Sequence, residues 1–259
     1  MPDRIRLDGR VAVVTGAAGV IGTATMRLLA ERGAHIVAVD RKQVELQTAV
    51  RDLPASARAV AIAADVTRED EVADYVRAAV DTFGTIDVFH NNAGVEGDIA
   101  PITRYSLQAF RKVIDVNVVG VFLGLKHVLP VMLKQNKGSI INTASIAGLI
   151  GSPDIAAYSA SKHAVIGLTK SAALECTATG VRVNCVCPGL IDSRMLSAIL
   201  QGRQGGNAPV PNDRITERIP ARRLGHASEV ASIVAFLASD EASYVSGSAY
   251  TVDGGRTAG

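Results

Sequence analysis

The stretch RVAVVTGAAGVIG, residues 10–22, decides the fold of this chain. Its first six residues form an apolar run rich in β-branched side chains, which predicts a strand buried on both faces. Glycines follow at positions 16, 19 and 22, and a helical pattern begins directly after them. Such a turn lets a pyrophosphate approach the backbone and places it at the N-terminus of the helix. The stretch therefore predicts the first strand–turn–helix unit of a dinucleotide-binding fold. A Gly-Lys-Ser/Thr sequence is missing from it, which disfavours an ATP-binding P-loop.

Short apolar runs continue to alternate with longer amphipathic segments along the rest of the chain. Strands are expected at 10–15, 35–40, 59–64, 86–91, 139–144, 181–187 and 248–252. Helices are expected at 23–33, 43–53, 69–83, 106–136, 157–179 and 228–239. This alternation predicts an α/β fold of the Rossmann type, a doubly wound parallel sheet of about seven strands with helices on both faces. Without repeats or a Pro-rich linker, residues 1–259 are expected to form a single domain.

Residues 190–225 do not follow this alternation of strand and helix segments. They contain the tract QGRQGGNAPVPND (201–213), whose Gly, Pro and Asn content predicts irregular structure. A long loop in a compact α/β domain is either functional or disordered. Because this one follows the carboxyl end of a strand, where open α/β sheets bind ligands, we expect a substrate lid.

Composition excludes several classes of protein. Hydrophobic residues make up 48% of the 259 residues and charged residues 20%, and the net charge is +2. Neither nucleic acid nor a membrane surface is an expected partner of so weakly charged a chain. The longest uncharged stretches, 11–26 and 138–153, are too short and polar to span a membrane. The charged N-terminus does not resemble a signal peptide, and no metal-ligand spacing occurs among Cys and His. A cytoplasmic protein without a metal site is expected.

Two carboxylates follow the second and third expected strands. Asp40 ends the segment 35–40, where it can accept hydrogen bonds from ribose hydroxyls and repel a 2′-phosphate, which favours NAD over NADP. The neighbouring Arg41 could partly accommodate a phosphate. The other interpretation of Asp40 is an N-cap for the helix that starts near residue 43. Asp65 likewise either reaches the adenine or caps the helix that starts near residue 69.

Several further motifs occur in a fixed order. They are TGAAGVIG (15–22), NNAG (91–94), Asn117 in VIDVNVVG, Ser145 in NTASIAG, YSASK (158–162), PGLIDS (188–193) and VDGG (252–255). In this order and spacing, which cover essentially the whole chain, the sequence resembles the short-chain dehydrogenase/reductase family. The resemblance implies an NAD(P)-dependent alcohol dehydrogenase or ketone reductase that assembles as a homotetramer, partly through the segments 106–136 and 157–179.

The resemblance also implies roles for individual residues. The catalytic set is Asn117, Ser145, Tyr158 and Lys162. The cofactor-binding set is Gly16, Gly19, Val20, Ile21, Gly22, Asp40, Asp65, Val66, Asn92, Gly94, Tyr158, Lys162, Pro188, Ile191 and Ser193. In the family, the serine hydroxyl holds the substrate oxygen, the lysine also binds the nicotinamide ribose, and the asparagine side chain or backbone holds a water molecule.

Elementary chemistry supports the proton-transfer role of YSASK. Tyr158 and Lys162 lie about one turn apart on one helix face. A free tyrosine has a pKa near 10, so it is a poor base at neutral pH. A nearby ammonium, together with the positive nicotinamide ring of NAD, favours the phenolate and lowers that pKa. Tyr158 can then take the proton of an alcohol, or return it to a ketone, while hydride moves. The alternative for the isolated pair is an ordinary surface contact.

Two positions differ from the usual family pattern. Val20 stands where the second glycine of the Gly-rich turn normally falls, and it does not readily adopt a positive φ. The turn is therefore expected to be reshaped, with Gly19 in the strained position. Ser193 replaces a common threonine but keeps the hydroxyl that would bind the nicotinamide carboxamide.

The substrate is expected to be mainly hydrophobic. Apolar residues of the lid, including Met195, Leu196, Ile199 and Leu200, are expected to meet Ala147, Leu149 and Ile150. Glu96 either meets a polar substrate group or is a solvated loop charge. We therefore predict an NAD-dependent oxidoreductase that interconverts a secondary alcohol, cyclic alcohols included, and its ketone. The alternative is a non-catalytic dinucleotide-binding sensor or scaffold on the same fold.

Overall fold

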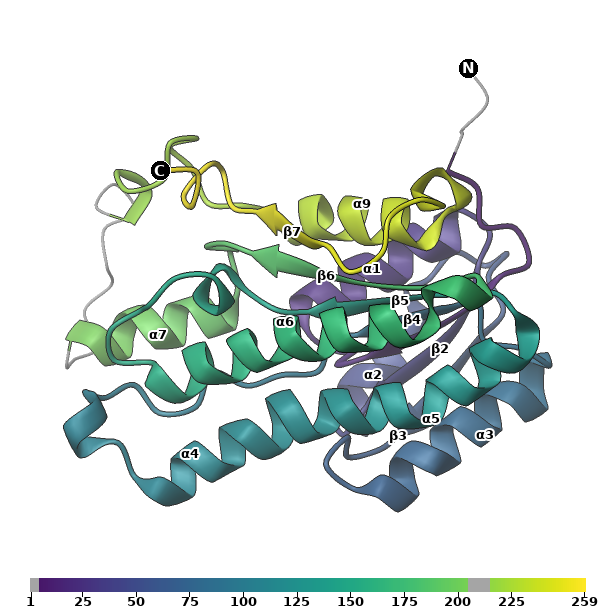
Figure 1. Ribbon diagram of the computed structural model, residues 1–259, viewed down its shortest axis with the longest axis horizontal. Helices are drawn as coiled ribbons and strands as arrows, with labels where there is room; N and C mark the ends of the chain where they lie inside the picture. Colours follow the sequence, from purple (N-terminus) through teal and green to yellow (C-terminus); the bar gives the residue numbers. More distant parts are fainter. Residues whose placement is uncertain (1–4, 205–214) are drawn as a thin grey trace.

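The computed structural model describes residues 5–204 and 215–259, and in this part of the chain seven parallel strands form one sheet (Figure 1). The strands are β1 (Val11–Thr15), β2 (His35–Asp40), β3 (Ala59–Ala63), β4 (Val88–Asn91), β5 (Gly138–Thr143), β6 (Val181–Pro188) and β7 (Ala249–Val252). Their order is β3-β2-β1-β4-β5-β6-β7, with every pair parallel. The predicted fold class is confirmed.

Helices cover both faces of this sheet (Figure 1). One face carries α1 (Val20–Glu31), α2 (Gln43–Arg51) and α9 (Ala227–Ala238), and the other carries α3 (Glu69–Phe83), α5 (Gly120–Gln135) and α6 (Ala156–Cys176). Successive strand residues point to opposite faces, so Val13 joins the core beneath α3 while Val14 joins the core beneath α1. The strands are continuously apolar because helices cover both faces of the sheet.

The helix expected at 106–136 is interrupted. Helix α4 (Leu107–Ile114) ends in a π turn (Asp115–Val119), and α5 begins at Gly120. The backbone N–H of Gly120 donates to the carbonyl of Asp115, five residues earlier. Turns of this kind are rare and often lie at functional sites. Apolar periodicity did not reveal the interruption because the segment stays helical on both sides of it.

The same helical stretch, Leu107–Gln135, is long and apolar enough to cross a membrane by length and composition alone. Its inward side chains, such as Leu125, Val128 and Met132, lie in the core beneath the sheet. It is therefore a core helix of the fold.

The expectation of irregular structure over 190–225 is wrong for its first part. Residues Arg194–Gln204 form helix α7. Ser193 precedes this helix, and its hydroxyl accepts a hydrogen bond from the backbone N–H of Leu196 at 3.2 Å, which is the geometry of an N-cap. Buried Leu196 then anchors the first turn. Most of the glycine-rich tract, residues 205–213, lies outside the described residues, as does Arg214.

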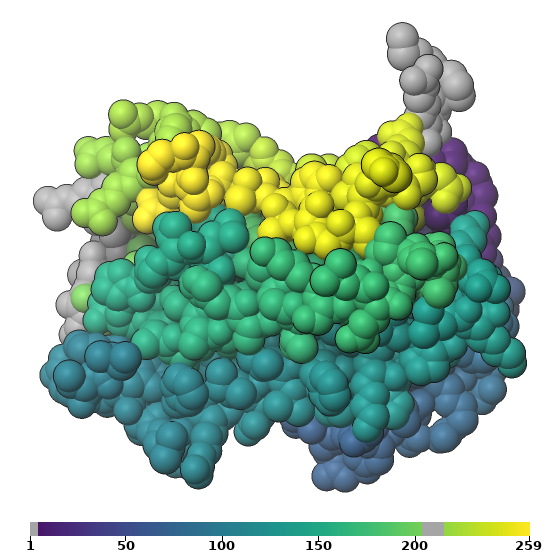
Figure 2. Space-filling view, viewed as in Figure 1, coloured from purple at the N-terminus to yellow at the C-terminus, as the bar shows by residue number. Residues whose placement is uncertain are grey.

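The C-terminal segment packs against the chain that follows residue 215. In the space-filling view these yellow and yellow-green segments lie against each other (Figure 2). The N–H of Ala221 donates to the carbonyl of Gly254, and Arg256 donates to the carbonyl of Arg218 at 3.1 Å. The C-terminal segment therefore holds residues 218–221 in place.

Candidate active site

The predicted site residues gather along the carboxyl edge of the sheet. The strand order reverses between β1 and β4, because β2 and β3 lie on one side of β1 while β4 to β7 continue on the other. In open α/β sheets, ligands bind outside the carboxyl ends of the strands at this reversal.

The glycine-rich loop forms a tight cradle at the end of β1. Gly16 has a φ of +63°, which an L-residue rarely adopts. A Cβ on Gly22 would lie 2.2 Å from the carbonyl oxygen of Gly16, so this helix residue must be glycine for the loop to close. Val20 and Ile21 occupy the first turn of α1, where N–H groups have no intrahelical acceptor. This space and these donors fit the pyrophosphate of a dinucleotide.

The expected reshaping of the turn at Gly19 is wrong. Gly19 has a φ of −77° and is the N-cap of α1, while Val20 is the first helical residue and is half-exposed. The positive φ falls on Gly16, three residues earlier. Val20 is therefore tolerated because its position is helical, and helical backbone suits any L-residue.

Asp40 is held by the loop that it faces. Its Oδ2 accepts from the N–H of Ala18 at 3.1 Å and its Oδ1 accepts from the N–H of Lys42 at 3.0 Å. Lys42, not Asp40, is the N-cap of α2. A carboxylate offers about four acceptor positions, so about two remain for ribose hydroxyls.

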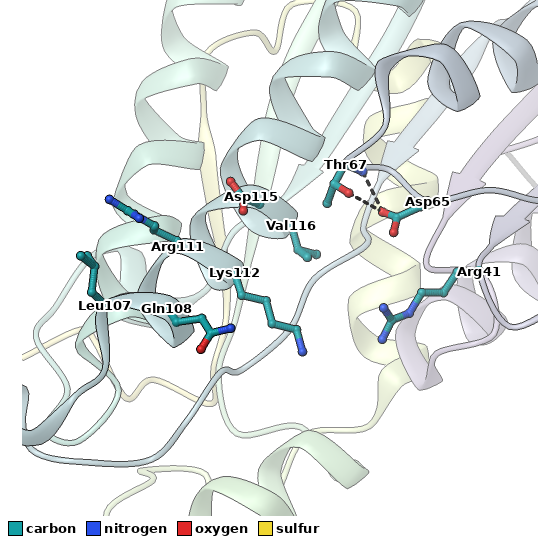
Figure 3. Close-up of a pocket in the computed structure, with 9 residues that line it drawn as sticks. All are labelled: Arg41, Asp65, Thr67, Leu107, Gln108, Arg111, Lys112, Asp115 and Val116. Atoms are coloured by element: carbon teal, nitrogen blue, oxygen red, sulfur yellow. Dashed lines mark hydrogen bonds between the residues drawn. The ribbon is translucent and has the colours of Figure 1, made fainter.

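A cavity of about 460 Å³ lies beyond Asp40, between the loop after β3 and the π turn (Figure 3). It is lined by Arg41, Asp65, Thr67, Leu107, Gln108, Arg111, Lys112, Asp115 and Val116. Arg41 and Lys112 extend toward this space from opposite walls, whereas Arg111 points away from it (Figure 3). Its size and place beside Asp40 fit the adenosine end of a dinucleotide.

Asp65 and Thr67 line this cavity on the side next to β3, and Val66 lies between them in sequence. The Oδ1 of Asp65 accepts from the N–H and hydroxyl of Thr67 at 2.9 and 2.8 Å. The N-cap of α3 is Arg68, so Asp65 does not cap that helix with its side chain. A Cβ on Gly120 would lie 2.9 Å from Cγ2 of Val66. Val66 therefore packs closely against the residue that follows the π turn.

Asn92 connects the cradle to the catalytic side of the site. Its Nδ2 donates to the carbonyls of Thr15 and Gly16 at 3.0 and 3.3 Å, and its Oδ1 accepts from the hydroxyl of Thr143 at 3.1 Å. Buried His90 reaches the same hydroxyl through Nε2 at 2.9 Å. Because that hydroxyl donates to Asn92, His90 must donate to it. Burial lowers the pKa of His90 to about 3. Sequence reasoning did not connect Thr15, Thr143 and His90 with the site.

Tyr158 is buried at the start of α6, beside Ser145 at the end of β5. Burial raises the pKa of Tyr158 to about 12, a hydrogen bond with the Ser145 side chain lowers it, and Glu96 and Cys187 raise it. In the protein by itself, burial therefore dominates over any effect of the lysine. The predicted lowering concerned the protein with a positive nicotinamide ring bound, and it stays a prediction.

Lys162 is also buried, with 3% of its surface exposed. Its Nζ donates to the carbonyl of Thr143 at 2.7 Å and lies 5.6 Å from the centroid of the Tyr158 ring. Burial lowers the pKa of Lys162 to about 8. A Cβ on Gly94 would lie 3.5 Å from this Nζ, so the bare backbone of Gly94 leaves room above the lysine. The pair is a buried constellation rather than a surface contact.

Asn117 sits in the π turn, and its side chain is fully engaged. The Oδ1 accepts from the N–H of Val95 at 2.8 Å, and the Nδ2 donates to the carbonyl of Val95 at 2.9 Å and to the hydroxyl of Ser161 at 3.0 Å. Of the two alternatives for holding a water molecule, these contacts favour the backbone of the π turn over the side chain.

The PGLIDS segment closes the site from the β6 side. The carbonyl of Pro188 accepts from the Ser145 hydroxyl at 3.4 Å, and Ile191 is buried beside Gly225. The Ser193 hydroxyl donates to the carbonyl of Ile191 at 3.1 Å while it caps α7. Its structural role is therefore visible, and its ligand role is a prediction.

An apolar cluster lies where the substrate pocket was expected, although its membership differs from the expected one. Tyr158 packs in a cluster whose other members are Ala147, Ile155, Ile99, Met195 and Ile199. Leu149 and Ile150 are instead exposed, at 41% and 42%. Glu96 is 12% exposed at its side chain and paired to Arg194, so it is not a solvated loop charge. In residues 5–204 and 215–259, no cluster of His, Cys, Asp and Glu could hold a metal ion.

A family model described as Enoyl-(Acyl carrier protein) reductase matches residues 16–257. Levodione reductase from Leifsonia aquatica is 38% identical over 98% of this chain and 96% of its own length. The chain belongs to the short-chain dehydrogenase/reductase family. Cyclohexanol dehydrogenase from Acinetobacter sp. is 39% identical over 97% of this chain and 96% of its own. The crystal structure of NAD+-bound xylitol dehydrogenase matches with a TM-score of 0.92 and 36% identity, covering 96% of this chain and 99% of that one.

Membership confirms the family resemblance and the enzyme class. The chain is an oxidoreductase that acts on CH–OH groups and uses a nicotinamide cofactor. The alternative of a non-catalytic sensor loses its basis, because a sensor needs no buried Ser145, Tyr158 and Lys162 beside an apolar cluster.

Proposed function

We propose that this enzyme interconverts a mainly hydrophobic secondary alcohol, cyclic alcohols included, and its ketone with NAD as the hydride carrier. The observation that carries the proposal is the burial of Tyr158 beside Ser145 in an apolar cluster that includes residues of α7. The names of two relatives, levodione reductase and cyclohexanol dehydrogenase, support a cyclic substrate.

In the proposed reaction, Tyr158 takes the alcohol proton at its phenol oxygen or returns it to the ketone oxygen. The hydroxyl of Ser145 donates to the substrate oxygen as negative charge develops there. The positive charge of Lys162 favours the phenolate. When bound, the nicotinamide supplies the hydride acceptor and donor. Asn117 holds the loop at Val95 and, through the π turn, positions the water route to Lys162.

The cofactor would be held by the residues that line the carboxyl edge. The loop from Gly16 to Gly22 would hold the pyrophosphate, Asp40 the adenosine ribose, and the segment that contains Asp65 and Val66 the adenine. Asn92 and Gly94 would line the middle of the groove. Lys162 would hold the nicotinamide ribose. Pro188, Ile191 and Ser193 would contact the carboxamide.

NAD rather than NADP is proposed because of the fixed carboxylate of Asp40. Two backbone N–H groups orient that carboxylate, so it cannot swing away from a 2′-phosphate without losing both hydrogen bonds. Arg41 and Lys112 at the neighbouring cavity are the opposing feature, since two cations attract a phosphate. The fixed carboxylate is hydrogen-bonded to the glycine-rich loop through Ala18, and we expect it to dominate.

We further propose a cytoplasmic homotetramer in which residues 190–225 act as the substrate lid. Exposed apolar side chains support assembly along α4, α5 and α6. They are Phe110, Val119, Phe122, Leu133 and Leu174. Sedimentation velocity would test the assembly.

A substrate panel tests the proposed reaction. Cyclic and open-chain secondary alcohols and their ketones would be followed by NADH absorbance, with NADP in parallel reactions. The expected result is turnover of a cyclic secondary alcohol with NAD. Turnover of primary alcohols only, or higher kcat/KM with NADP, would contradict the proposal.

A further inference from the structure

An ion pair joins the two segments that face each other across the active site. Nη1 of Arg194 lies 2.7 Å from Oε1 of Glu96, and Nη2 lies 3.2 Å from Oε2. Glu96 follows the NNAG motif after β4, and Arg194 is the first residue of α7. The Glu96 side chain is 12% exposed, whereas that of Arg194 is 72% exposed. This two-point contact fixes the orientation of both groups, with the carboxylate on the inside.

Helix α7 is also fastened at its other end. The guanidinium of Arg203 donates to the hydroxyl of Ser152 at 2.8 Å and to the carbonyl of Pro153 at 2.9 Å. Nearby, a Cβ on Gly202 would lie 2.6 Å from the Cβ of Ile99, so the helix packs closely on the loop after NNAG. Between these two attachments, the helix presents apolar side chains to the Tyr158 cluster.

The two attachments differ in their effect on Tyr158. The charged and titratable groups that face Tyr158 are Lys162 on its own helix, Glu96 after β4 and Cys187 in β6. After burial and the Ser145 hydrogen bond, the negative charge of Glu96 is the next influence and raises the pKa of the phenol. Arg194 faces Glu96 and opposes that charge, whereas the hydrogen bonds of Arg203 to Ser152 and Pro153 go to uncharged groups.

We infer that Glu96 and Arg194 form a latch that fastens α7 over the active site and whose net charge shifts the pH at which Tyr158 transfers protons. Both act through Tyr158 and are positioning residues, so the inference rests on the proposed role of that tyrosine. Opening the latch separates the cation from the carboxylate. When the ion pair is closed, α7 covers the substrate and Arg194 offsets the charge of Glu96. The covering of the substrate is thus coupled to the pH at which Tyr158 loses its proton.

The sign of each effect follows from Coulomb's law. In alcohol oxidation Tyr158 must be deprotonated, so kcat/KM falls on the acid side with a midpoint set by its pKa in the loaded enzyme. Glu96→Gln removes a negative charge and leaves a cation, which lowers the midpoint. Arg194→Gln leaves the carboxylate without its partner, which raises the midpoint. Each shift should be about half a pH unit or more, and the double variant should return toward wild type.

The experiment compares wild type, Glu96→Gln, Arg194→Gln, the double variant and Arg203→Gln with the best alcohol from the panel. The pH profile of kcat/KM is measured for each, and hydrogen exchange of α7 is measured without substrate or cofactor. We expect opposite midpoint shifts in the first two variants, an unchanged midpoint in Arg203→Gln, and faster exchange of α7 in both arginine variants.

Specific outcomes overturn the inference. The electrostatic role of the ion pair is refuted if the midpoint shifts in Glu96→Gln and Arg194→Gln have the same sign. It is also refuted if Arg203→Gln shifts the midpoint as much as Arg194→Gln does. In either case the ion pair would only hold α7 in place. Unchanged hydrogen exchange of α7 in Arg194→Gln would show that the ion pair does not fasten this helix. If Tyr158→Phe instead kept normal turnover in the same assay, the proposed function itself would fail, so the two failures are distinguishable.

Discussion

The cofactor cradle after β1 and the proton-transfer cluster after β5 share one edge of the sheet but are built differently. The cradle consists of backbone and glycines that are adjacent in sequence, from Gly16 to Gly22. The cluster consists of buried side chains from the turn after β5 and from α6, and burial displaces the pKa values of Tyr158 and Lys162. A binding surface for phosphates needs oriented N–H groups, whereas proton transfer needs a titratable group whose surroundings control its charge.

This comparison predicts that the two regions fail in different ways, and the largest effect belongs to the cluster. Tyr158→Phe removes the proton-transfer oxygen and should lower kcat by roughly 10²–10⁴-fold. Because the cradle is untouched, the Kd of NADH should stay within a few-fold, as measured by nucleotide fluorescence. A large loss of NADH binding would show that the two regions are not separable.

The cradle should instead lose binding and stability together. Gly22→Ala places a Cβ against the carbonyl of Gly16 and should lower the free energy of unfolding by about 1–3 kcal/mol while weakening NADH binding. Gly19→Ala is the matched control in the same loop, because its Cβ would be 3.2 Å from the same oxygen and its φ is negative. Thermal melts should separate the two variants, and equal melting temperatures would contradict the packing explanation.

Asp40 contributes a charged side chain to the cofactor cradle, which otherwise consists of backbone groups. It therefore tests whether a single side chain can control what the cradle binds. Asp40→Ala removes the carboxylate that repels a 2′-phosphate and exposes the effect of Arg41 and Lys112. We expect the NADP/NAD ratio of kcat/KM to rise by about tenfold or more, equivalent to roughly 1.4 kcal/mol. Arg41→Gln is the control and should move the ratio in the opposite direction. An unchanged ratio in Asp40→Ala would refute the role of the carboxylate.

The smallest effect concerns the network that joins the two regions. His90 has a pKa of about 3 in the folded protein because of burial, against about 6.5 in an unfolded chain. Between these pH values the unfolded state binds more protons, so stability falls as pH decreases from 6.5. His90→Gln keeps a donor toward Thr143 but cannot titrate, and its stability should fall less steeply between pH 6.5 and 5. Parallel denaturation curves for the two proteins would contradict this account.

Much of the site was predictable because parallel strands bring their carboxyl ends to one edge. Motifs that follow β1, β4, β5 and β6 were therefore expected to meet, and they do. The helix α7 was missed because the Gly-, Pro- and Asn-rich tract that begins at residue 201 dominated the interpretation of the whole segment, although most residues of α7 are good helix formers. Its cap at Ser193 and its contact with Ile99 stabilise it.

The sequence alone determined the order of strands and helices, the position of the cradle, and the presence of Ser145, Tyr158 and Lys162. These follow from local periodicity, local backbone requirements and motif order. Tertiary structure alone decided which polar groups are buried, which partners they find, and thus in which direction their pKa values move. The placement of the positive φ at Gly16, the His90–Thr143–Asn92 network and the Glu96–Arg194 pair belong to this second class. Their energies depend on distances between residues far apart in the chain, and those distances exist only once the chain has packed.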